Sequence, residues 1–520
     1  MSENPYLEDI KHSLPRLLAL FDRDPLSKTC GVGDRYFWGW KLIDFGNGTF
    51  QGIAHGLARL LKNDVLPECI SKTAVYALID DIFTGTDFLC RKNGSMEEAL
   101  PYESSFCVTA LVAYDLLTTI ELLDTINPST RDHYLEIIEP MIKFLLVAEE
   151  QHAFISNHLA TAAAALFKWD KLVGSKPAEQ RAKDILKQIL DHQSTEGWFR
   201  EYEGADPGYQ SLCCYYLADI HQYRPDLQLL EPLRRSIVFL SFFAHPDGSF
   251  GGLYGSRNTR FYYPAGIEAL SNYIPEAKAL ALFMRQSILR QKVVGLLAMD
   301  EPNITPMFNS FCWAAVLLHQ QGKNVPEQTC VLPQNIPGPW IKHFHHAGLI
   351  IGRQCQKYLV ISAYKGGVCY CCDSHDTEID CGVLAVDQNN VHYTTQGYQK
   401  ENEVTVNDTQ VTIISFFSKY KQPLPTPARF ILLRLLSLTI MKNVYLCNLV
   451  KKLLVKLLIT GQSKTHWKNK RTITWQKEIS IHDEFVGKQS DTLKYFKNSK
   501  AFSVIHMASK GYWQRQDTEL

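Results

Sequence analysis

The 520-residue sequence lacks the features that mark several common classes of protein. It contains no apolar run long enough to cross a bilayer, so it predicts no membrane-spanning helix. It also lacks a phosphate-binding glycine loop, a dinucleotide fingerprint, the kinase motif set and a Gly-X-Ser-X-Gly elbow. These absences exclude the common cofactor-dependent enzymes, and we expect no cofactor.

Signs of secretion are also missing. The first nine residues are acidic and have no apolar core, which predicts that no secretory signal is present. The fourteen cysteines are scattered, and they include the adjacent pairs Cys213-Cys214 and Cys371-Cys372. This spacing suits no disulfide framework and is typical of a reducing compartment. We therefore expect a cytoplasmic protein.

One long stretch has no acidic residue. Between Asp408 and Glu478 there are thirteen Lys and Arg residues and no Asp or Glu, although the formal net charge of the chain is zero. Such asymmetry indicates an anionic partner, which could be a polyanionic chain, an acidic lipid or a nucleic acid.

The same stretch contains a Leu/Lys-rich segment near 425–470. Lys451, Lys452 and Lys456 stand among leucines, which predicts a helix with a cationic edge and a broad apolar face. The apolar run 430–441 before it is too short to span a bilayer. Either both segments pack on the β-sandwich while the lysines face water, or residues 429–471 make peripheral contact with the anionic inner face of the membrane.

The first 325 residues predict a helical domain. Apolar residues recur there at helical spacing, and Gly, Pro and Asn separate about twelve such segments. The clearest segments are 53–61, 74–88, 106–123, 134–148, 158–169, 182–190, 211–220, 233–243, 277–289 and 308–320.

The connections between these segments resemble one another. Asn47-Gly-Thr-Phe50, Glu196-Gly-Trp-Phe199 and Asp247-Gly-Ser-Phe250 each lead towards a helix. Repeats of paired helices imply a stacked or closed array. We expect an (α/α) toroid of about six helical hairpins over residues 1–332, with its loops around a central cleft.

After the proline-rich segment 333–339 the pattern changes. Short runs rich in β-branched residues follow, separated by Gly, Asp and Asn, at 347–352, 358–363, 382–386, 404–417 and 472–485. These runs predict an antiparallel β-sandwich over residues 333–520, with the Leu/Lys-rich segment as an insertion. The predicted fold class is α+β multidomain.

Two motifs in the helical half suggest a catalytic site. Asn157 and His158 begin an alanine-rich helix, where an amide can donate to a carboxylate and an imidazole can donate or accept a proton. Tyr209 begins a later helix, and its phenol would be a useful base only if cations such as Arg257 lowered its pKa. Ordinary helix capping and aromatic packing are the structural alternatives.

Several loops of the helical half are aromatic and basic. Such side chains stack on sugar rings and hold carboxylates when loops of one array share a cleft. We expect substrate contacts from Trp38, Lys41, Gln51, Tyr102, Glu103, Trp198, Arg200, Gln210, Arg260 and Tyr263.

In the second half, His375 lies near Asp376 and Asp380, after a Cys-X-Cys-Cys run. This spacing is not that of a zinc site, so we predict no metal ion and leave an interface role open. His343, His345 and His346 follow the proline-rich segment and are expected at an interface or in solvent.

This pattern resembles the heparinase II/III-like superfamily, with its alginate-lyase relatives and the related uronyl C5-epimerases. The resemblance covers most of residues 30–400 and rests on Asn157-His158, on Tyr209, and on a second set of residues. That second set is Ala347-Gly348, Arg353, Tyr358, Gly366-Gly367, His375 and Asp380. It implies a helical toroid followed by a β-sandwich.

The resemblance also implies roles. Asn157 would neutralise a uronate carboxylate, Tyr209 would act as base or acid, and His158 would be its partner. Arg257 or Arg260 would add positive charge, and His375 is a tentative match to a histidine of the sandwich. The family often has aromatic residues and a histidine just beyond the tyrosine, whereas residues 211–214 here are Ser-Leu-Cys-Cys.

Removal of the C5 proton next to a masked carboxylate leads to two outcomes. Expulsion of the C4 oxygen gives a polysaccharide lyase, and reprotonation gives a uronyl C5-epimerase. The expected partner is an anionic uronate glycan, polymeric or lipid-linked, and no nucleic acid is expected. Two other classes stay open: a glycoside hydrolase using two of Glu103, Glu201, Asp206 and Asp247, and a non-catalytic glycan-binding protein.

Overall fold

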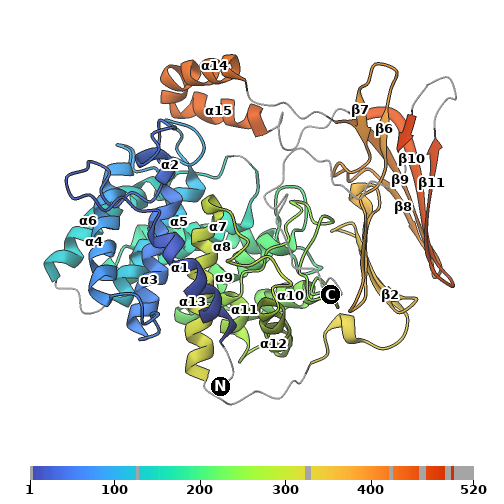
Figure 1. The fold of residues 1–520 in the computed structure, drawn as a ribbon, viewed down its shortest axis with the longest axis horizontal. Helices are drawn as coiled ribbons and strands as arrows, with labels where there is room; N and C mark the ends of the chain where they lie inside the picture. The colour runs from blue at the N-terminus through green and yellow to red at the C-terminus, as the bar shows by residue number, and fades with distance from the viewer. Residues whose placement is uncertain are drawn as a thin grey trace.

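The chain folds into a helical domain followed by a β-rich domain (Figure 1). The computed structural model describes residues 4–123, 128–151, 153–321, 330–420, 426–455, 464–486 and 494–496. None of the fourteen cysteines, all within these ranges, forms a disulfide. Across the same ranges, no helix combines the length and apolar content needed to cross a membrane.

The helical domain contains nearly all of the helices that the sequence predicts. Each of the ten clearest periodic segments coincides with a helix to within a few residues. The described helices are α1 (Pro5–Leu18), α2 (Arg35–Trp38), α3 (Ile53–Lys62), α4 (Lys72–Leu89), α5 (Phe106–Leu122), α6 (Pro128–Val147), α7 (Ser156–Val173), α8 (Lys176–Asp191), α9 (Pro207–Tyr223), α10 (Leu230–Ser241), α11 (Ala265–Leu270), α12 (Pro275–Leu289) and α13 (Glu301–Gln321).

Six of these helices form an inner ring. Contacts run from α3 to α5, α7, α9, α11 and α13, and from α13 back to α3. The helices α4, α6, α8, α10, α12 and α1 each pack outside one member of the ring. The ring is tight at α7 because residues 160–165 are Ala-Thr-Ala-Ala-Ala-Ala, and these small buried side chains let neighbouring helices approach closely.

The β-rich domain contains two antiparallel sheets, as the sequence predicts. One has the order β1-β2-β3-β4-β5, and the other has the order β11-β10-β9-β7-β6-β12, with β8 also paired to β9. The strands are β1 (Trp340–Phe344), β2 (Leu349–Gln354), β3 (Lys357–Ser362), β4 (Val368–Cys372), β5 (Thr377–Asp380), β6 (Leu384–Val386), β7 (His392–Thr394), β8 (Glu403–Val406), β9 (Gln410–Lys419), β10 (Lys464–Trp475), β11 (Ile479–Val486) and β12 (Lys494–Phe496).

The central strands of the five-stranded sheet, β2–β4, are buried on both faces. Ile350 and Ile361 point into a core shared with β9 and β10 of the second sheet. The alternate residues Ile351 and Val360 belong to the core of the helical domain. Because neither face meets solvent, β2–β4 read as continuous apolar runs rather than as an alternation.

A buried arginine joins the two sheets. Arg471 on β10 is inaccessible to solvent. Its guanidinium forms ion pairs with Asp380 of β5 at 2.6 Å and with Asp483 of β11 at 2.7 Å. It also donates to the Gly367 carbonyl at 3.1 Å. Asp380 therefore has a structural partner within the β-rich domain.

The two domains are linked by hydrogen bonds between loops and strands. The Tyr358 hydroxyl donates to the Phe242 carbonyl at 2.7 Å, and the Tyr370 hydroxyl donates to Asp247 Oδ2 at 2.6 Å. The Glu196 carboxylate accepts from the backbone N–H groups of His346 and Ala347 at 2.9 and 3.0 Å. The histidine segment thus lies at the interface, as expected.

Replacing Tyr370 by Phe should weaken this interface. The change removes a donor from the largely buried Asp247 carboxylate, and hydrogen bonds to charged groups contribute about 1.5–3 kcal/mol. We expect the free energy of unfolding in urea to fall by that amount. Tyr358→Phe is the matched control, because its hydroxyl meets a neutral carbonyl and its loss should cost about 1 kcal/mol. Equal losses for both variants would contradict a special role for Asp247.

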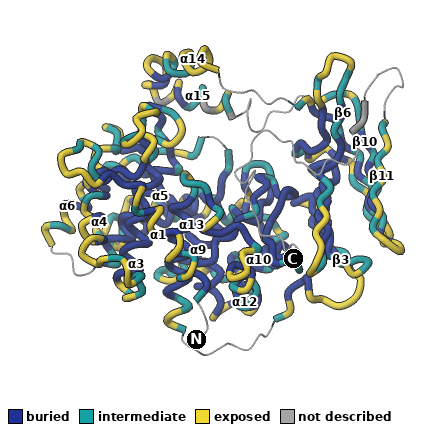
Figure 2. The backbone as a smooth tube through the Cα atoms, in the orientation of Figure 1, coloured by how far each residue is buried: buried dark blue, intermediate teal, exposed yellow. Residues whose placement is uncertain are grey.

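The Leu/Lys-rich insertion forms a helical hairpin that stands apart from both sheets (Figure 1). It consists of α14 (Pro427–Leu438), a short turn and α15 (Val444–Val455). Much of its surface is exposed (Figure 2), so packing on the β-rich domain does not account for it. Lys456, which the sequence places on the cationic edge, lies outside the described residues.

Candidate active site

The connections before α7 and α9 are joined to each other. The Ser156 hydroxyl and backbone N–H both contact the Arg200 carbonyl, at 2.7 and 3.1 Å. Ile155 and Glu201 form an isolated antiparallel bridge. Because Ser156 is held in this way, it does not cap α7, and no side chain accepts the first N–H groups of the helix. Neither Ser156 nor Asn157 therefore caps α7 in the structure.

Asn157 points its amide at a buried carboxyl. Its Nδ2 donates to Glu201 Oε2 at 2.8 Å, and both side chains are almost fully buried. Burial raises the pKa of Glu201 to about 8, which outweighs the opposite effects of His158, Arg257 and the Asn157 amide. Glu201 is therefore mostly protonated at neutral pH. A protonated carboxyl can donate a hydrogen bond to an anion.

Arg257 supplies positive charge beside this carboxyl. Its guanidinium lies over the ring of Tyr202, 4.3 Å from the ring centroid, and the residue is 7% exposed. Its Nε is buried and has no hydrogen-bond acceptor among the described residues. Buried donors are nearly always paired in proteins, so this atom indicates a place where an acceptor can bind.

Asp206 fixes the positions of two candidate residues at once. Its Oδ1 accepts from the backbone N–H of Tyr209 at 3.2 Å, which caps α9. Its Oδ2 accepts from the backbone N–H of Arg257 at 2.9 Å, and its carboxylate also contacts Thr259. Asp206 is fully buried and engaged, so the structure gives it a positioning role in place of a hydrolytic one.

Tyr209 begins α9 with its side chain half-buried. Its ring packs edge-on against Phe261, with 5.2 Å between centroids. Burial raises the pKa of Tyr209 well above its ordinary value, and the lowering effect of Arg257 does not compensate. The condition under which Tyr209 would be a useful base, a pKa lowered by cations, is not met in the described state, because desolvation of the phenolate dominates. Tyr209 thus keeps its proton and is suited to act as an acid.

His158 has an acidic partner that the sequence did not reveal. Its Nδ1 lies 2.6 Å from Glu150 Oε2, and its side chain is 19% exposed. Burial would lower the pKa of the imidazole, but Cys107 and Glu150 raise it well above its ordinary value. A histidine oriented by a carboxylate is a common general base once it has lost its proton. Glu150 lies eight residues before His158 in the irregular connection that precedes α7, where the sequence follows no helical or strand pattern.

A lysine from the β-rich domain holds the loop that carries Arg257. Lys365 lies in the short helix Ala363–Lys365 and is almost fully buried. Its Nζ donates to the Leu253 carbonyl at 3.0 Å and also to the Gly255 carbonyl and Asn258 Oδ1. Burial lowers the pKa of Lys365 to about 7. The sequence did not predict this contact of Lys365.

Three predicted substrate contacts are buried structural residues instead. Gln51 is inaccessible, and its amide bonds the backbone of Gly33 and Gly31. The Gln210 amide donates to Ser236, and the Trp198 indole donates to Glu196 at 3.0 Å. Because loop residues near a site and loop residues in a core have similar sequences, the sequence did not separate them.

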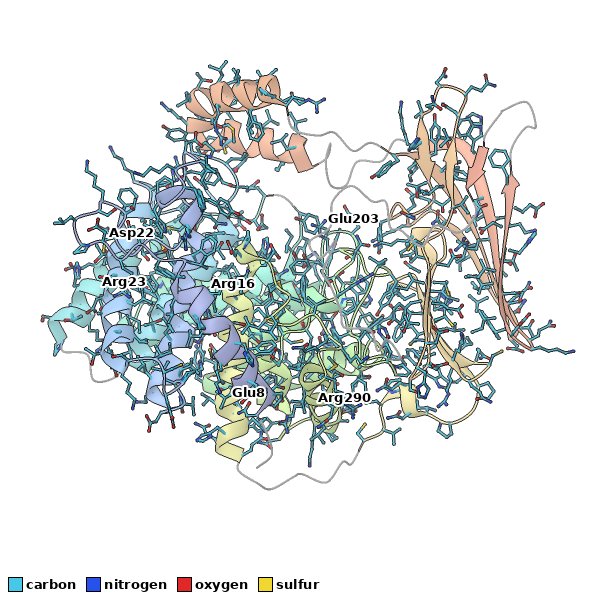
Figure 3. The ribbon with its side chains drawn as sticks, in the orientation of Figure 1. Glu8, Arg16, Asp22, Arg23, Glu203 and Arg290 are labelled. Carbon is cyan, nitrogen blue, oxygen red and sulfur yellow. The ribbon has the colours of Figure 1, made fainter. Side chains whose placement is uncertain are left out.

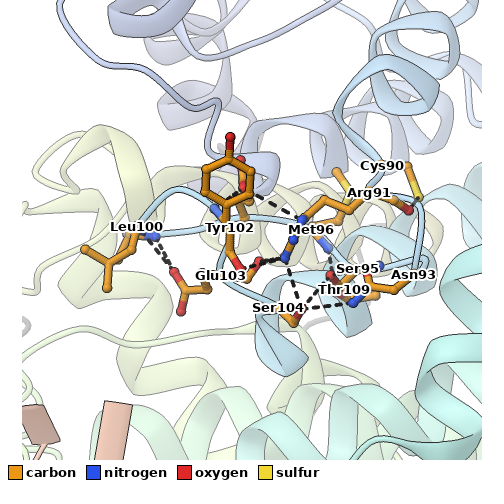
Figure 4. Close-up of polar contacts among 12 residues, drawn as sticks. Cys90, Arg91, Asn93, Ser95, Met96, Leu100, Tyr102, Glu103, Ser104 and Thr109 are labelled. Atoms are coloured by element: carbon orange, nitrogen blue, oxygen red, sulfur yellow. Dashed lines mark hydrogen bonds and ion pairs between the residues drawn. The ribbon is translucent and has the colours of Figure 1, made fainter. Parts of the chain in front are cut away.

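Tyr102 and Glu103 belong to a loop organised by Arg91 (Figure 4). Arg91 Nη1 donates to the carbonyls of Tyr102 and Glu103 at 2.7 and 2.9 Å. The Glu103 carboxylate accepts from the backbone N–H groups of Ala99 and Leu100. Glu103 is therefore engaged in the loop, whereas the ring of Tyr102 is partly exposed.

The remaining predicted residues are dispersed. The Trp38 indole donates to the Leu20 carbonyl at 2.8 Å, and Lys41 is exposed in the following turn. Arg200 is exposed and donates to the Tyr202 carbonyl. Arg260 is half-buried, whereas Tyr263 is buried with its ring against Phe261.

His375 does not join the candidate site. It is exposed in the β4–β5 turn, and its backbone N–H donates to Asp373 at 2.7 Å. Within the described ranges, no group of three or more His, Cys, Asp or Glu side chains is placed to hold a metal ion. The structure does bring together Asn157, His158, Tyr209 and Arg257, because all four lie close to Glu201.

Comparisons with known proteins place the fold but no family. No protein-family description matches the sequence. No curated protein matches it either. Among solved structures, the Streptomyces coelicolor A3 chondroitin AC lyase in complex with chondroitin sulphate is similar over 95% of this chain and 68% of that one, with a TM-score of 0.53 and 10% identity.

Two further structures are similar at lower scores. Heparinase III has a TM-score of 0.46 and 11% identity over 94% of this chain and 79% of that one. D-mannose isomerase has a TM-score of 0.40 and 11% identity over 60% of this chain and 98% of that one. At 10% identity, the likeness to the chondroitin AC lyase concerns the fold alone.

Proposed function

We propose that this chain is a polysaccharide lyase-like enzyme that removes the C5 proton of a uronic acid in an anionic glycan. The observation that carries the proposal is the buried, protonated Glu201 carboxyl, hydrogen-bonded to Asn157 at 2.8 Å. Beside it lies Arg257 with an unpaired donor among the described residues. The chondroitin AC lyase of similar fold was solved with chondroitin sulphate, an anionic polysaccharide.

The fold itself is proposed to be an (α/α) toroid over residues 1–332 and a β-sandwich over 333–520. The closed ring of contacts through α3, α5, α7, α9, α11 and α13 supports the toroid. The core shared by the two antiparallel sheets supports the sandwich. Glu203, which follows Glu201 by two residues, lies on the side of the helical domain towards the β-rich domain (Figure 3).

The first task of the site is to mask the uronate carboxylate. A C5 proton becomes removable only when the charge of the adjacent carboxylate is neutralised and the developing enolate is stabilised. Protonated Glu201, the Asn157 amide and Arg257 Nε provide three kinds of donor for this purpose. The donors are buried, so they are held in place before the substrate arrives.

The second task is proton transfer. The neutral form of His158, oriented by Glu150, takes the C5 proton, and the C5–H electrons pass into the enolate of the carboxylate. The enolate then forms the C4–C5 double bond as the C4–O bond breaks. Tyr209, which keeps its proton in the described state, donates that proton to the leaving oxygen.

The same first step allows C5 epimerisation. If the enolate is reprotonated at C5 from the opposite face before the C4–O bond breaks, the product is the epimer. The residues at the site are the same for both outcomes, and the reaction products separate them.

A two-carboxylate glycoside hydrolase is less well supported. Of the four carboxylates that the sequence offered, Glu103, Asp206 and Asp247 accept structural hydrogen bonds from nearby backbone or side-chain donors. Glu201 is buried with a raised pKa, but hydrolysis needs a second carboxylate that is available to act on the substrate.

The proposal predicts an ultraviolet absorbance rise from an unsaturated uronate on one of alginate, heparosan, chondroitin or a lipid-linked uronate glycan. Asn157→Ala should lower kcat/KM on the order of 10²-fold, since it removes one donor to the developing charge. Asn63→Ala, at the far end of α3, is the matched control and should leave the rate unchanged.

The assay should be run in heavy water. Deuterium at C5 without absorbance would identify the epimerase outcome and retain the proposed first step. New reducing ends without absorbance would identify hydrolysis, and binding without any reaction would identify a glycan-binding protein. Either of those two results would overturn the proposal.

A further inference from the structure

The α14–α15 hairpin, residues 427–455, exposes an unusual amount of apolar surface. Large apolar side chains on it are 40% exposed or more. They are Phe430, Ile431, Leu432, Leu435, Leu438, Ile440, Tyr445, Leu446, Leu449 and Leu453. An amphipathic helix in a globular protein normally turns such side chains towards the core. A patch of this kind indicates an interaction surface.

The exposed side chains form a stripe on each helix. In α14 the stripe runs through Ile431, Leu435 and Leu438, and in α15 it runs through Leu446, Leu449 and Leu453. These spacings of three or four residues place each set on one side of its helix. The inner seam of the hairpin is made instead by the buried side chains of Ser437, Met441 and Cys447.

The hairpin contacts the helical domain through its basic side chains. Arg434 forms an ion pair with Asp44 at 2.9 Å, and its guanidinium lies over the ring of Phe45. Lys442 Nζ lies 5.4 Å from the centroid of the Tyr102 ring. These contacts attach the hairpin to the helical domain while its leucines stay exposed (Figure 2).

The charge on the hairpin selects among possible partners. Residues 427–455 contain Arg429, Arg434, Lys442, Lys451 and Lys452 and no acidic residue. A second copy of the same face would bring like charges together. A partner that is both apolar and anionic fits instead, and the surface of a membrane with acidic lipids has both properties.

We propose that the α14–α15 hairpin docks this protein on an anionic membrane surface, with its leucine stripes in the interface and its lysines at the headgroups. Each helix has twelve residues and is about 18 Å long, so the hairpin lies in the surface and does not cross it. The inference goes beyond the proposed glycan chemistry and does not depend on it.

Co-sedimentation of the full chain with vesicles tests this inference. Binding to phosphatidylglycerol–phosphatidylcholine vesicles at low salt should exceed binding to phosphatidylcholine vesicles on the order of tenfold, and high salt should weaken it. The variant L435D/L449D should bind on the order of 10²-fold more weakly, because two apolar contacts are lost and two negative charges are added. K452Q, which changes an exposed lysine and leaves the contact of Lys442 with Tyr102 in place, should lower only the preference for anionic vesicles.

The control is L26D/V147D, which changes two even more exposed apolar side chains on the helical domain and should bind as the unmodified chain does. Since Leu435 and Leu449 are more than half exposed, L435D/L449D should keep the circular dichroism spectrum and Tm. No binding at low salt, or equal binding by L435D/L449D, would overturn the inference. If the chain forms a dimer without lipid, and L435D/L449D dissociates that dimer, the inference is also overturned. The face is then assigned to a second copy of the chain.

Discussion

Replacing Tyr209 by Phe is expected to lower kcat on a uronate glycan on the order of 10²-fold or more, with little change in KM. The substitution removes one hydroxyl and keeps the ring that packs on Phe261. Since burial keeps the phenol protonated, the lost group is the proton donor for the leaving oxygen. Steady-state rates on glycans with a good leaving group at C4 provide a further test, because they should be less affected.

Tyr202→Phe is the control for this prediction. Tyr202 lies in the same cluster, and the guanidinium of Arg257 sits over its ring. That contact uses the face of the ring and not the hydroxyl, so the variant should keep nearly full activity. If Tyr209→Phe turns over normally, or if both variants lose activity equally, the acid role of Tyr209 is wrong.

Most of the fold could be predicted because burial leaves a period in the sequence. Amphipathic and fully buried helices repeat apolar residues at helical spacing. These repeats predict most of the helices from α3 to α13. The sheets were predicted from β-branched runs, although the strand order was not. The strand order depends on which face each strand buries. The strands β2–β4 are apolar on both faces, so their sequences do not reveal this order.

The candidate site was partly predictable. Asn157, His158 and Tyr209 stand at helix starts, where the sequence signal is strongest, and the structure places them at the connections before α7 and α9. Glu150 and Lys365 were missed because they reach the site from a loop and from the other domain. Gln51 and Gln210 were misassigned, since a buried amide that bonds backbone has no distinct pattern in sequence.

The α14–α15 hairpin is a further case in which the sequence predicts an element but not its contacts. Its leucine and lysine spacing predicts a helix around Lys451 and Lys452, and α15 lies there. The spacing defines an apolar side but does not say whether that side meets a core, a partner or a membrane. The exposure of Leu435 and Leu449 shows that this side does not meet a core.

Glu201 should make both activity and stability depend on pH in the alkaline range. The proposed site needs Glu201 protonated, so activity should fall as pH rises through about 8, where the carboxyl loses its proton. Activity should also fall at low pH, because the raised pKa of His158 keeps the base protonated there. In the Glu201→Gln variant, the glutamine amide donates at every pH. The loss of activity at high pH should therefore disappear, whereas the loss of activity at low pH should remain.

The stability of the chain should follow the same group. The pKa of Glu201 is raised from 4.5 to about 8 on folding, so the folded state holds this proton more tightly than the unfolded state. The contribution of Glu201 to the free energy of unfolding is therefore fully present below pH 4.5 and is lost as the pH rises to about 8. Relative to Glu201→Gln, the unfolding free energy should fall by up to roughly 5 kcal/mol over that range. Urea unfolding at several pH values measures this, with the nearby Glu203→Gln as control. A constant difference between the wild-type and Glu201→Gln curves would show that Glu201 titrates normally and is not the proton-holding group of the site.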